Sequence, residues 1–177
     1  DGQTTLNIDG ETFPVIKDWK FENKYDFIIA VGKPSIKKQL VSKALNYGLK
    51  PHKTIVDPSA IVLMGQEKLG YGGIISPGCV VTSNIKLGDY VTLNLNTTVG
   101  HDTTMGDYCT TNPGVHISGQ IEMGESNEFG TGCIVRDRLT IGSNKTFGAQ
   151  TAVVKSILGD ESEIYVGIPA KILQKNL

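Results

Sequence analysis

The chain has 177 residues, 39% of them hydrophobic, and a formal net charge of −1, so it is long enough for one sizeable core or two small ones. This balance of charge predicts no electrostatic surface for nucleic acid. The apolar runs are short and no charged-then-apolar leader opens the sequence, so we expect a cytoplasmic protein with neither a membrane span nor a secretory signal.

Residues 1–57 predict a small, incomplete α/β domain of the Rossmann-like type that binds the acceptor. Residues 25–33 read as a buried strand ending near a glycine, residues 34–47 as a helix, and residues 53–56 as a second strand. The apolar face of the helix is expected to hold Ile36, Leu40, Val41 and Leu45. The earlier strand, glycine-rich turn and helix of a complete nucleotide-binding domain are missing, so we expect the domain to be truncated.

From residue 63 to residue 153 a core-type side chain recurs every six residues, with Thr111 as the one departure. The positions are Leu63, Leu69, Ile75, Val81, Leu87, Leu93, Val99, Met105, Thr111, Ile117, Met123, Phe129, Val135, Ile141, Phe147 and Val153. Glycine follows at 70, 88, 100, 106, 124, 130, 142 and 148, which favours a short strand and then a bend. A period of six fits neither a helix nor plain alternation, so the sequence predicts triangular coils of eighteen residues.

Stacked coils bring residues eighteen apart over one another, which predicts a mainly β fold, a hexapeptide-repeat parallel β-helix over residues 58–154. Residues 155–177 are expected to form a C-terminal cap and tail, with a strand, a Gly-Ile-Pro turn and a short helix or extension. Cys79, Cys109 and Cys133 share one position of the repeat and are expected to be buried thiols, because a disulfide or a metal cluster needs convergent positions.

His101 and Asp102 are the candidate catalytic pair, since a carboxylate beside an imidazole can hold it in one tautomer for general base catalysis. Taken alone, the dipeptide favours a solvated surface histidine, and the eighteen-residue stacking shifts the balance toward a catalytic pair. Gly119 lies eighteen residues further on, so its backbone N–H could face an acyl carbonyl that becomes an oxyanion. Asn94, at the preceding corner, offers an amide to orient an acceptor.

The chain has neither the Gly-x-Ser-x-Gly motif nor a phosphate-binding Gly-x-x-x-x-Gly-Lys loop, so covalent catalysis is not favoured. Direct attack by an amine or hydroxyl on a thioester uses the groups that the chain offers. Most glycine-rich corners are explained by turning alone. A side-chain-poor wall for an extended pantetheine arm is predicted at Gly130, Thr131, Gly132, Gly148 and Ala149.

These motifs resemble those of the bacterial hexapeptide-repeat sugar acetyltransferases, which modify sialic acids or nucleotide-linked amino sugars. The resemblance rests on VGHDTTMGDY (99–108), NPGVHISG (112–119), IEMGE (121–125), FGTG (129–132) and VGIPAK (166–171). It implies a left-handed coil, acetyl transfer from acetyl-CoA to a sugar amine or hydroxyl without a metal, a homotrimer with active sites between adjacent coils, and a role in surface polysaccharide biosynthesis.

By position, the resemblance assigns the general base to His101, its acidic companion to Asp102, an active-site amide to Asn94 and the carbonyl donor to Gly119. Gly130, Gly148 and Ala149 match the CoA groove, and Pro169 and Lys171 the C-terminal turn near the cofactor. Thr110 stands where some relatives carry a second histidine, so it is the other candidate for acceptor contact. Some relatives also carry Glu where Asp102 stands, and the glycine-rich loop that contacts the nucleotide-sugar is missing.

Two other classes of function remain open at this stage. One is a non-catalytic β-helix scaffold or binding protein. The other is a metalloenzyme of the carbonic anhydrase type, which needs three converging histidines, whereas His101 and His116 are fifteen residues apart and fall at different corners. The acceptor sugar, and the choice between N- and O-acetylation, cannot be read from these residues.

Overall fold

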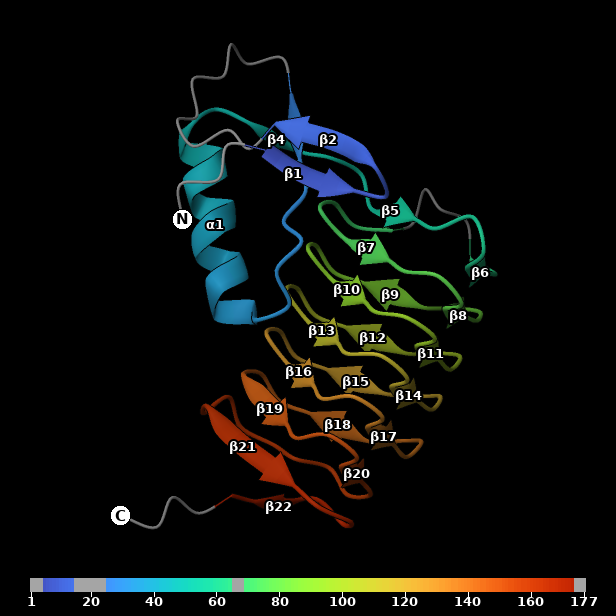
Figure 1. The fold of residues 1–177 in the computed structure, drawn as a ribbon. Coiled ribbons are helices and arrows are strands. Elements are labelled where there is room, and N and C mark those ends of the chain that lie inside the picture. The colour runs from blue at the N-terminus through green and yellow to red at the C-terminus, as the bar shows by residue number, and fades with distance from the viewer. Residues whose placement is uncertain (1–4, 15–24, 65–68, 174–177) are drawn as a thin grey trace.

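The computed structural model describes residues 5–14, 25–64 and 69–173 and shows a parallel β-solenoid with one helix along its side (Figure 1). The strands stack into three faces. The first face consists of β5 (Ile55–Val56), β7 (Ile74–Ile75), β10 (Thr92–Leu93), β13 (Thr110–Thr111), β16 (Glu128–Phe129), β19 (Lys145–Phe147), β21 (Glu163–Val166) and β22 (Lys171–Ile172). The second consists of β6 (Ile61–Val62), β8 (Val80–Val81), β11 (Thr98–Val99), β14 (His116–Ile117), β17 (Ile134–Val135) and β20 (Ala152–Val153). The third consists of β9 (Lys86–Leu87), β12 (Thr104–Met105), β15 (Glu122–Met123) and β18 (Thr140–Ile141).

The eighteen-residue register is confirmed along most of the solenoid. Thr92 pairs with Thr110, and Thr110 pairs in turn with Glu128. Every sixth residue from Ile75 to Val153 is buried, Thr111 included. These side chains therefore form the continuous core that the period predicts, while the left-handed sense of the coil stays a prediction.

The three cysteines lie in this core as free thiols, as their shared repeat position predicts. Burial raises the pKa of Cys109 to about 12, because the thiolate would have to form away from water. These thiols are therefore structural.

The first coil departs from the expected register. Ile55 pairs with Ile74 and Ile61 with Val80, so this coil is nineteen residues long and begins ahead of residue 58. The extra residue moves Leu63 past the inward position, where it is 67% exposed, and Val62 packs against the core instead. The prediction for Leu63 was therefore wrong, as was the assignment of residues 53–56 to the α/β domain, because β5 belongs to the solenoid.

The N-terminal part was expected to be an incomplete Rossmann-like domain with one strand-helix-strand unit. A hairpin of β1 (Thr5–Ile8) and β2 (Glu11–Pro14) precedes β3 (Asp26–Phe27), α1 (Pro34–Asn46) and β4 (Lys50–Pro51). β3 and β4 pair in parallel, and over the described residues they form a two-stranded sheet. The structure thus shows one strand-helix-strand unit, and the rest of the predicted domain is not shown. α1 has 13 residues, and none of the described residues forms a helix long and apolar enough to cross a membrane.

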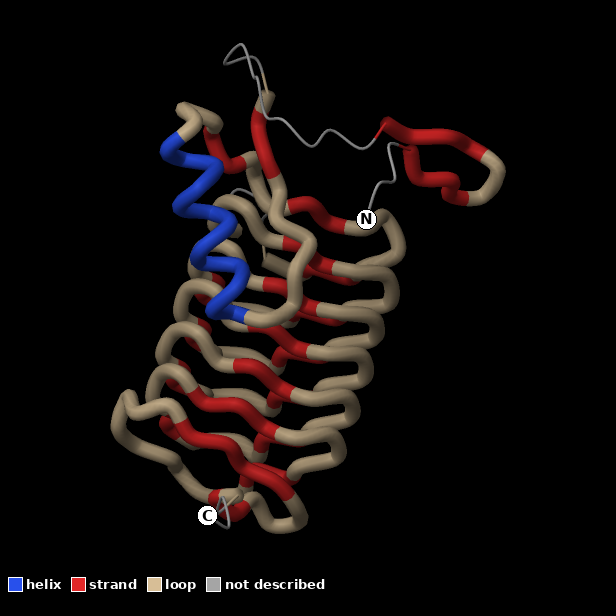
Figure 2. The backbone as a smooth tube through the Cα atoms, turned by 60° about the vertical axis from the view of Figure 1, so that its left-hand side comes forward, coloured by secondary structure: helices blue, strands red, loops and turns tan. Residues whose placement is uncertain are grey.

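Helix α1 lies against the first face of the solenoid (Figures 1 and 2). It buries Pro34, Lys37, Val41 and Ala44, whereas Ile36 and Leu45, which we expected on the packed face, are exposed. The buried face includes a lysine, a residue that a search for apolar periodicity does not count as core.

Lys37 fastens this helix to the solenoid. Its ammonium donates hydrogen bonds to the carbonyl of Tyr90 (3.0 Å) and to the hydroxyls of Thr92 (2.8 Å) and Thr110 (2.9 Å). Burial lowers the pKa of Lys37 to about 8, because the charged form loses its hydration. The helix is therefore held by a buried polar contact as well as by apolar packing.

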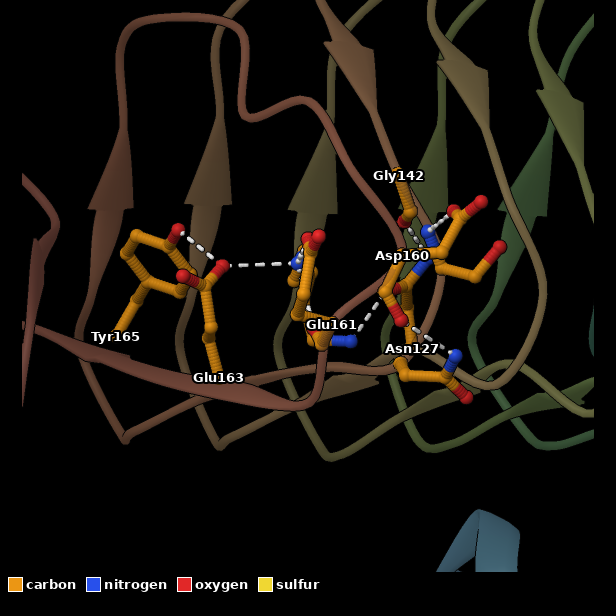
Figure 3. A network of polar contacts seen from close by, with 9 residues as sticks. Asn127, Gly142, Asp160, Glu161, Glu163 and Tyr165 are labelled. Carbon is orange, nitrogen blue, oxygen red and sulfur yellow. Dashed lines mark hydrogen bonds and ion pairs between the residues drawn. The ribbon is translucent and has the colours of Figure 1, made fainter.

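A second buried lysine, Lys145, lies near the C-terminal end of the solenoid, where its partners Glu161 and Glu163 are labelled in Figure 3. Lys145 Nζ donates to the carbonyl of Glu161 (2.6 Å) and to Glu163 Oε2 (2.8 Å), which also accepts from the Tyr165 hydroxyl (2.8 Å). β22 then pairs antiparallel with β21 at the edge of the first face. The C-terminal segment thus covers the end of the solenoid with strands, and its described residues form an extension rather than a helix.

Candidate active site

Each of the three corners of the solenoid repeats one residue in the left-handed conformation, with φ between 56° and 71°. The corner between the second and third faces, here the His101 corner, places Asn84, Asp102, Gln120 and Arg138 there. The glycine corner, between the first and second faces, has Gly78, Asn96, Gly114, Gly132 and Gln150. The tyrosine corner, between the third and first faces, has Gly72, Tyr90, Tyr108, Ser126 and Asn144. The backbone geometry is therefore shared, and the side chains distinguish the corners.

His101 and Asp102 interact directly. His101 Nδ1 lies 2.7 Å from Asp102 Oδ2, and the two side chains are 61% and 46% exposed. An ionised carboxylate can only accept hydrogen bonds, so in the neutral imidazole Nδ1 carries the proton and Nε2 keeps its lone pair. The imidazole is thus in the tautomer that a general base requires.

Asp102 has a second partner that the sequence analysis missed. Asn84, one coil earlier, donates from Nδ2 to Asp102 Oδ1 over 2.6 Å. The hydrogen bond from Asn84, followed by that from His101, lowers the pKa of the Asp102 carboxyl below its ordinary value. Asp102 is therefore ionised near neutral pH, with one carboxylate oxygen bonded to Asn84 and the other to His101. The eighteen-residue spacing between Asn84 and Asp102 is the feature of the sequence that could have identified this contact.

Gly119 lies against the imidazole, as the eighteen-residue spacing predicts. A Cβ added to Gly119 would be 2.8 Å from Nε2 of His101, closer than real Cβ atoms approach such a neighbour. The carbonyl of Gly119 accepts from Arg138 N (3.1 Å), and within the described part of the chain its N–H donates to no other protein group. A glycine at this position leaves Nε2 of His101 uncovered.

Asn94 and Thr110 do not join this pair within one chain. Asn94 follows β10 at the glycine corner, where its Oδ1 accepts from the backbone N–H of Leu95 (2.8 Å). Thr110 is 1% exposed beneath α1, where its hydroxyl receives the Lys37 ammonium. Burial removes Thr110 as an acceptor contact and makes it an anchor for the helix. Its partner is seventy-three residues away, so the repeat pattern could not reveal this.

The predicted cofactor residues gather along the glycine corner. Gly130 lies directly under the next coil, since a Cβ there would be 2.6 Å from the backbone nitrogen of Ala149. Thr131 and Ala149 are exposed, and Gly132 and Gly148 are half-buried beside them. The structure therefore places the five residues in one strip with few side chains.

The C-terminal turn lies at the end of this strip. Ala152 N donates to Gly167 O (3.1 Å), and Ala170 N donates to Ala152 O (2.8 Å). Pro169 and Lys171 line a hollow of about 240 Å³ with Ala170 and with Val154, Lys155 and Ile157, which follow β20 toward the His101 corner. The geometry thus joins the C-terminal turn to the second face beside the glycine corner.

A parallel β-solenoid with an imidazole–carboxylate pair at one corner and a bare strip at another has the architecture of hexapeptide-repeat acyltransferases. No family model matches the chain. The acetyltransferase domain of PglB from Neisseria gonorrhoeae is 31% identical, with a TM-score of 0.77 over 98% of this chain and 84% of that one. WeeI from Acinetobacter baumannii is 28% identical, with a TM-score of 0.85 over 98% and 83%. PerB from Caulobacter crescentus, in complex with CoA and GDP-perosamine, is 27% identical, with a TM-score of 0.75 over 83% and 69%.

The chain belongs to the bacterial hexapeptide-repeat sugar acetyltransferase family. A further structure of the N. gonorrhoeae domain contains acetyl coenzyme A, and other C. crescentus structures are described as perosamine N-acetyltransferase with CoA and GDP-perosamine.

Proposed function

We propose that this protein transfers the acetyl group of acetyl-CoA to an amine or hydroxyl of a sugar, with His101 as the general base. The observation that carries the proposal is the placement of the His101 ring, with Nε2 beside Gly119 and Nδ1 within 2.7 Å of Asp102 Oδ2. The favoured acceptor is a nucleotide-linked amino sugar, because C. crescentus relatives were solved with GDP-perosamine. Sialic acid is the alternative acceptor that the motifs allow.

In the proposed reaction, the acceptor nitrogen or oxygen attacks the thioester carbonyl and forms a bond to its carbon. Nε2 of His101 removes the acceptor proton, and Asp102 stabilises the resulting imidazolium. The N–H of Gly119 donates to the oxyanion of the tetrahedral intermediate. When the C–S bond breaks, the imidazolium returns the proton to the CoA sulfur, so the base is regenerated.

Acetyl-CoA is proposed to lie along the glycine corner, against Gly130, Thr131, Gly132, Gly148 and Ala149, with Pro169 and Lys171 at its far end. Asn94 lies at this corner and His101 at the next, so within a single chain the two halves of the site lie at different corners. We therefore propose a homotrimer in which the glycine corner of one subunit faces the His101 corner of its neighbour. A cytoplasmic location and a role in surface polysaccharide synthesis complete the proposal.

A metal-dependent mechanism has less support. His116 lies on the second face, where its Nδ1 is 2.9 Å from Thr98 Oγ1, and not at the corner that holds His101. Across residues 5–14, 25–64 and 69–173, no three His, Cys, Asp or Glu side chains gather as a metal site.

The test is a free-thiol release assay with acetyl-CoA and a panel of UDP-, dTDP- and GDP-linked amino sugars and sialic acid. Acetyl transfer to one acceptor class, verified by mass spectrometry of the product, supports the proposal. A parallel melting experiment with acetyl-CoA separates an enzyme from a scaffold, since a ligand that binds only the folded protein raises the melting temperature. If the protein released no thiol and acetyl-CoA did not raise its melting temperature, the proposal would be contradicted in favour of a non-catalytic scaffold.

A further inference from the structure

The catalytic pair is exposed, so packing alone does not hold it. His101 is 61% and Asp102 46% exposed, which leaves both side chains free to adopt other rotamers. A carboxylate with a single hydrogen bond could turn about its χ2 and release the imidazole. A second restraint on Asp102 is therefore needed to keep Nδ1 protonated and Nε2 directed at Gly119.

Asn84 supplies that restraint. Its Nδ2 donates to Asp102 Oδ1 (2.6 Å) while Asp102 Oδ2 faces His101 Nδ1 (2.7 Å), so each carboxylate oxygen has its own partner. Both Asn84 (φ 56°) and Asp102 (φ 58°) occupy the left-handed position of successive coils. The backbone of Asp102 is also held to the preceding coil, because its N–H donates to Ser83 O (3.1 Å).

We infer that Asn84 is a positioning residue for acetyl transfer: its carboxamide holds the carboxylate of Asp102 so that His101 keeps the base-competent tautomer and orientation. The inference rests on the proposed function. Asn84 touches neither reacting atom, so it acts through Asp102.

The chain offers a matched control for a purely structural role. Asn144, at the tyrosine corner, has the same left-handed backbone (φ 61°) and a similar inter-coil hydrogen bond, from Nδ2 to Asp160 O (2.9 Å). If these asparagine side chains only hold neighbouring coils together, replacing Asn84 and replacing Asn144 should change kcat equally.

The experiment replaces each asparagine with glycine, which removes the carboxamide and still accepts the left-handed backbone. Asn84→Gly is expected to lower kcat about tenfold with KM for acetyl-CoA within about twofold, the signature of a lost transition-state interaction. Asn144→Gly should keep the wild-type kcat. Asp102→Gly and the double variant Asn84→Gly/Asp102→Gly should have the same kcat, because Asn84 has no role once Asp102 is absent.

A second measurement does not depend on turnover. The ¹⁵N spectrum of the His101 ring should show the Nδ1-protonated tautomer in the wild-type protein and averaged tautomers in Asn84→Gly. Unchanged ¹⁵N shifts together with a wild-type kcat, or an equal loss of kcat with and without Asp102, would overturn the inference. Absence of transfer by the wild-type protein would instead reject the proposed function, while the ring spectra would still decide whether Asn84 sets the tautomer.

Discussion

The His101 corner and the glycine corner have the same left-handed backbone at successive coils, yet their side chains differ in kind. The first carries a series of polar side chains in which Asn84 donates to Asp102 and Arg138 Nε donates to Gln120 Oε1 (2.8 Å). The second has glycine at Gly78, Gly114 and Gly132. The solenoid thus fixes the turn, and the residue placed on it decides whether a corner can perform proton chemistry or accommodate an extended ligand.

Adding a methyl group at the His101 corner should have the largest effect. Gly119→Ala places a Cβ against Nε2, so the base is covered and the oxyanion donor obstructed. We expect kcat to fall by about a thousandfold, in the range found when such groups are lost. Steady-state kinetics measure this, with Gly114→Ala at the glycine corner as control. Equal activity of the two variants would show that Gly119 does not border the reacting atoms.

The tyrosine corner extends the comparison, because it holds helix α1 through Lys37. With a pKa near 8 in the folded state and 10.5 as its ordinary value, Lys37 is neutral between these pH values when folded and charged when unfolded. The unfolded chain then binds more protons, so the free energy of unfolding should rise with pH across this window by about 3 kcal/mol.

Urea denaturation from pH 8 to 10.5 measures this rise. Lys37→Met should flatten the profile, whereas Lys38→Met, which removes an exposed partner of Glu125, should keep it. A profile with the same slope in all three proteins would assign the pH dependence to other groups.

A negative charge on the glycine corner should weaken the binding of acetyl-CoA rather than slow the chemical step. Ala149→Glu adds bulk and a negative charge to an exposed position of the glycine corner, opposing the phosphates of acetyl-CoA. We expect KM for acetyl-CoA to rise about tenfold with kcat within about twofold. Ser42→Glu, on the exposed side of α1, adds the same charge and should change neither parameter. A fall in kcat without a change in KM would place the cofactor elsewhere.

The smallest effect tests the shared backbone itself. Gly114 has φ 69° and open space around a would-be Cβ, so Gly114→Ala should lose about 1 kcal/mol of stability from conformation alone. Gly114→Asn should lose less, because asparagine tolerates this region and already occupies it at Asn84. Thermal denaturation measures both. Equal losses would mean that the side chains of the two corners are not interchangeable.

The periodic part of the fold could be predicted because each coil repeats the same local choice. An apolar residue every six positions fixes the inward column, and eighteen-residue spacing then places Gly119 over His101. The same arithmetic identifies Asn84 as the partner of Asp102, although the sequence analysis did not apply it there. The inward position predicted for Leu63 was wrong because one additional residue in the first coil shifts the register without breaking the apolar pattern.

The contacts between the helix and the solenoid could not be predicted from the repeat. Lysine is rarely buried, so Lys37 gave no signal for the packed face of α1. Thr110 was a candidate only through the family resemblance, which gives no sign of its burial or of its long-range contact with Lys37. Such contacts depend on how two units meet, which neither spacing nor composition encodes.

The most direct test of the account is the kcat of His101→Ala at saturating acetyl-CoA, measured with the acceptor that the wild-type protein uses. We predict a fall of about 10²- to 10⁴-fold with KM for acetyl-CoA nearly unchanged, because the variant lacks the base but keeps the cofactor strip. His116→Ala, which removes the histidine on the second face, should retain the wild-type kcat. A His101→Ala variant with most of its turnover would contradict the general base mechanism.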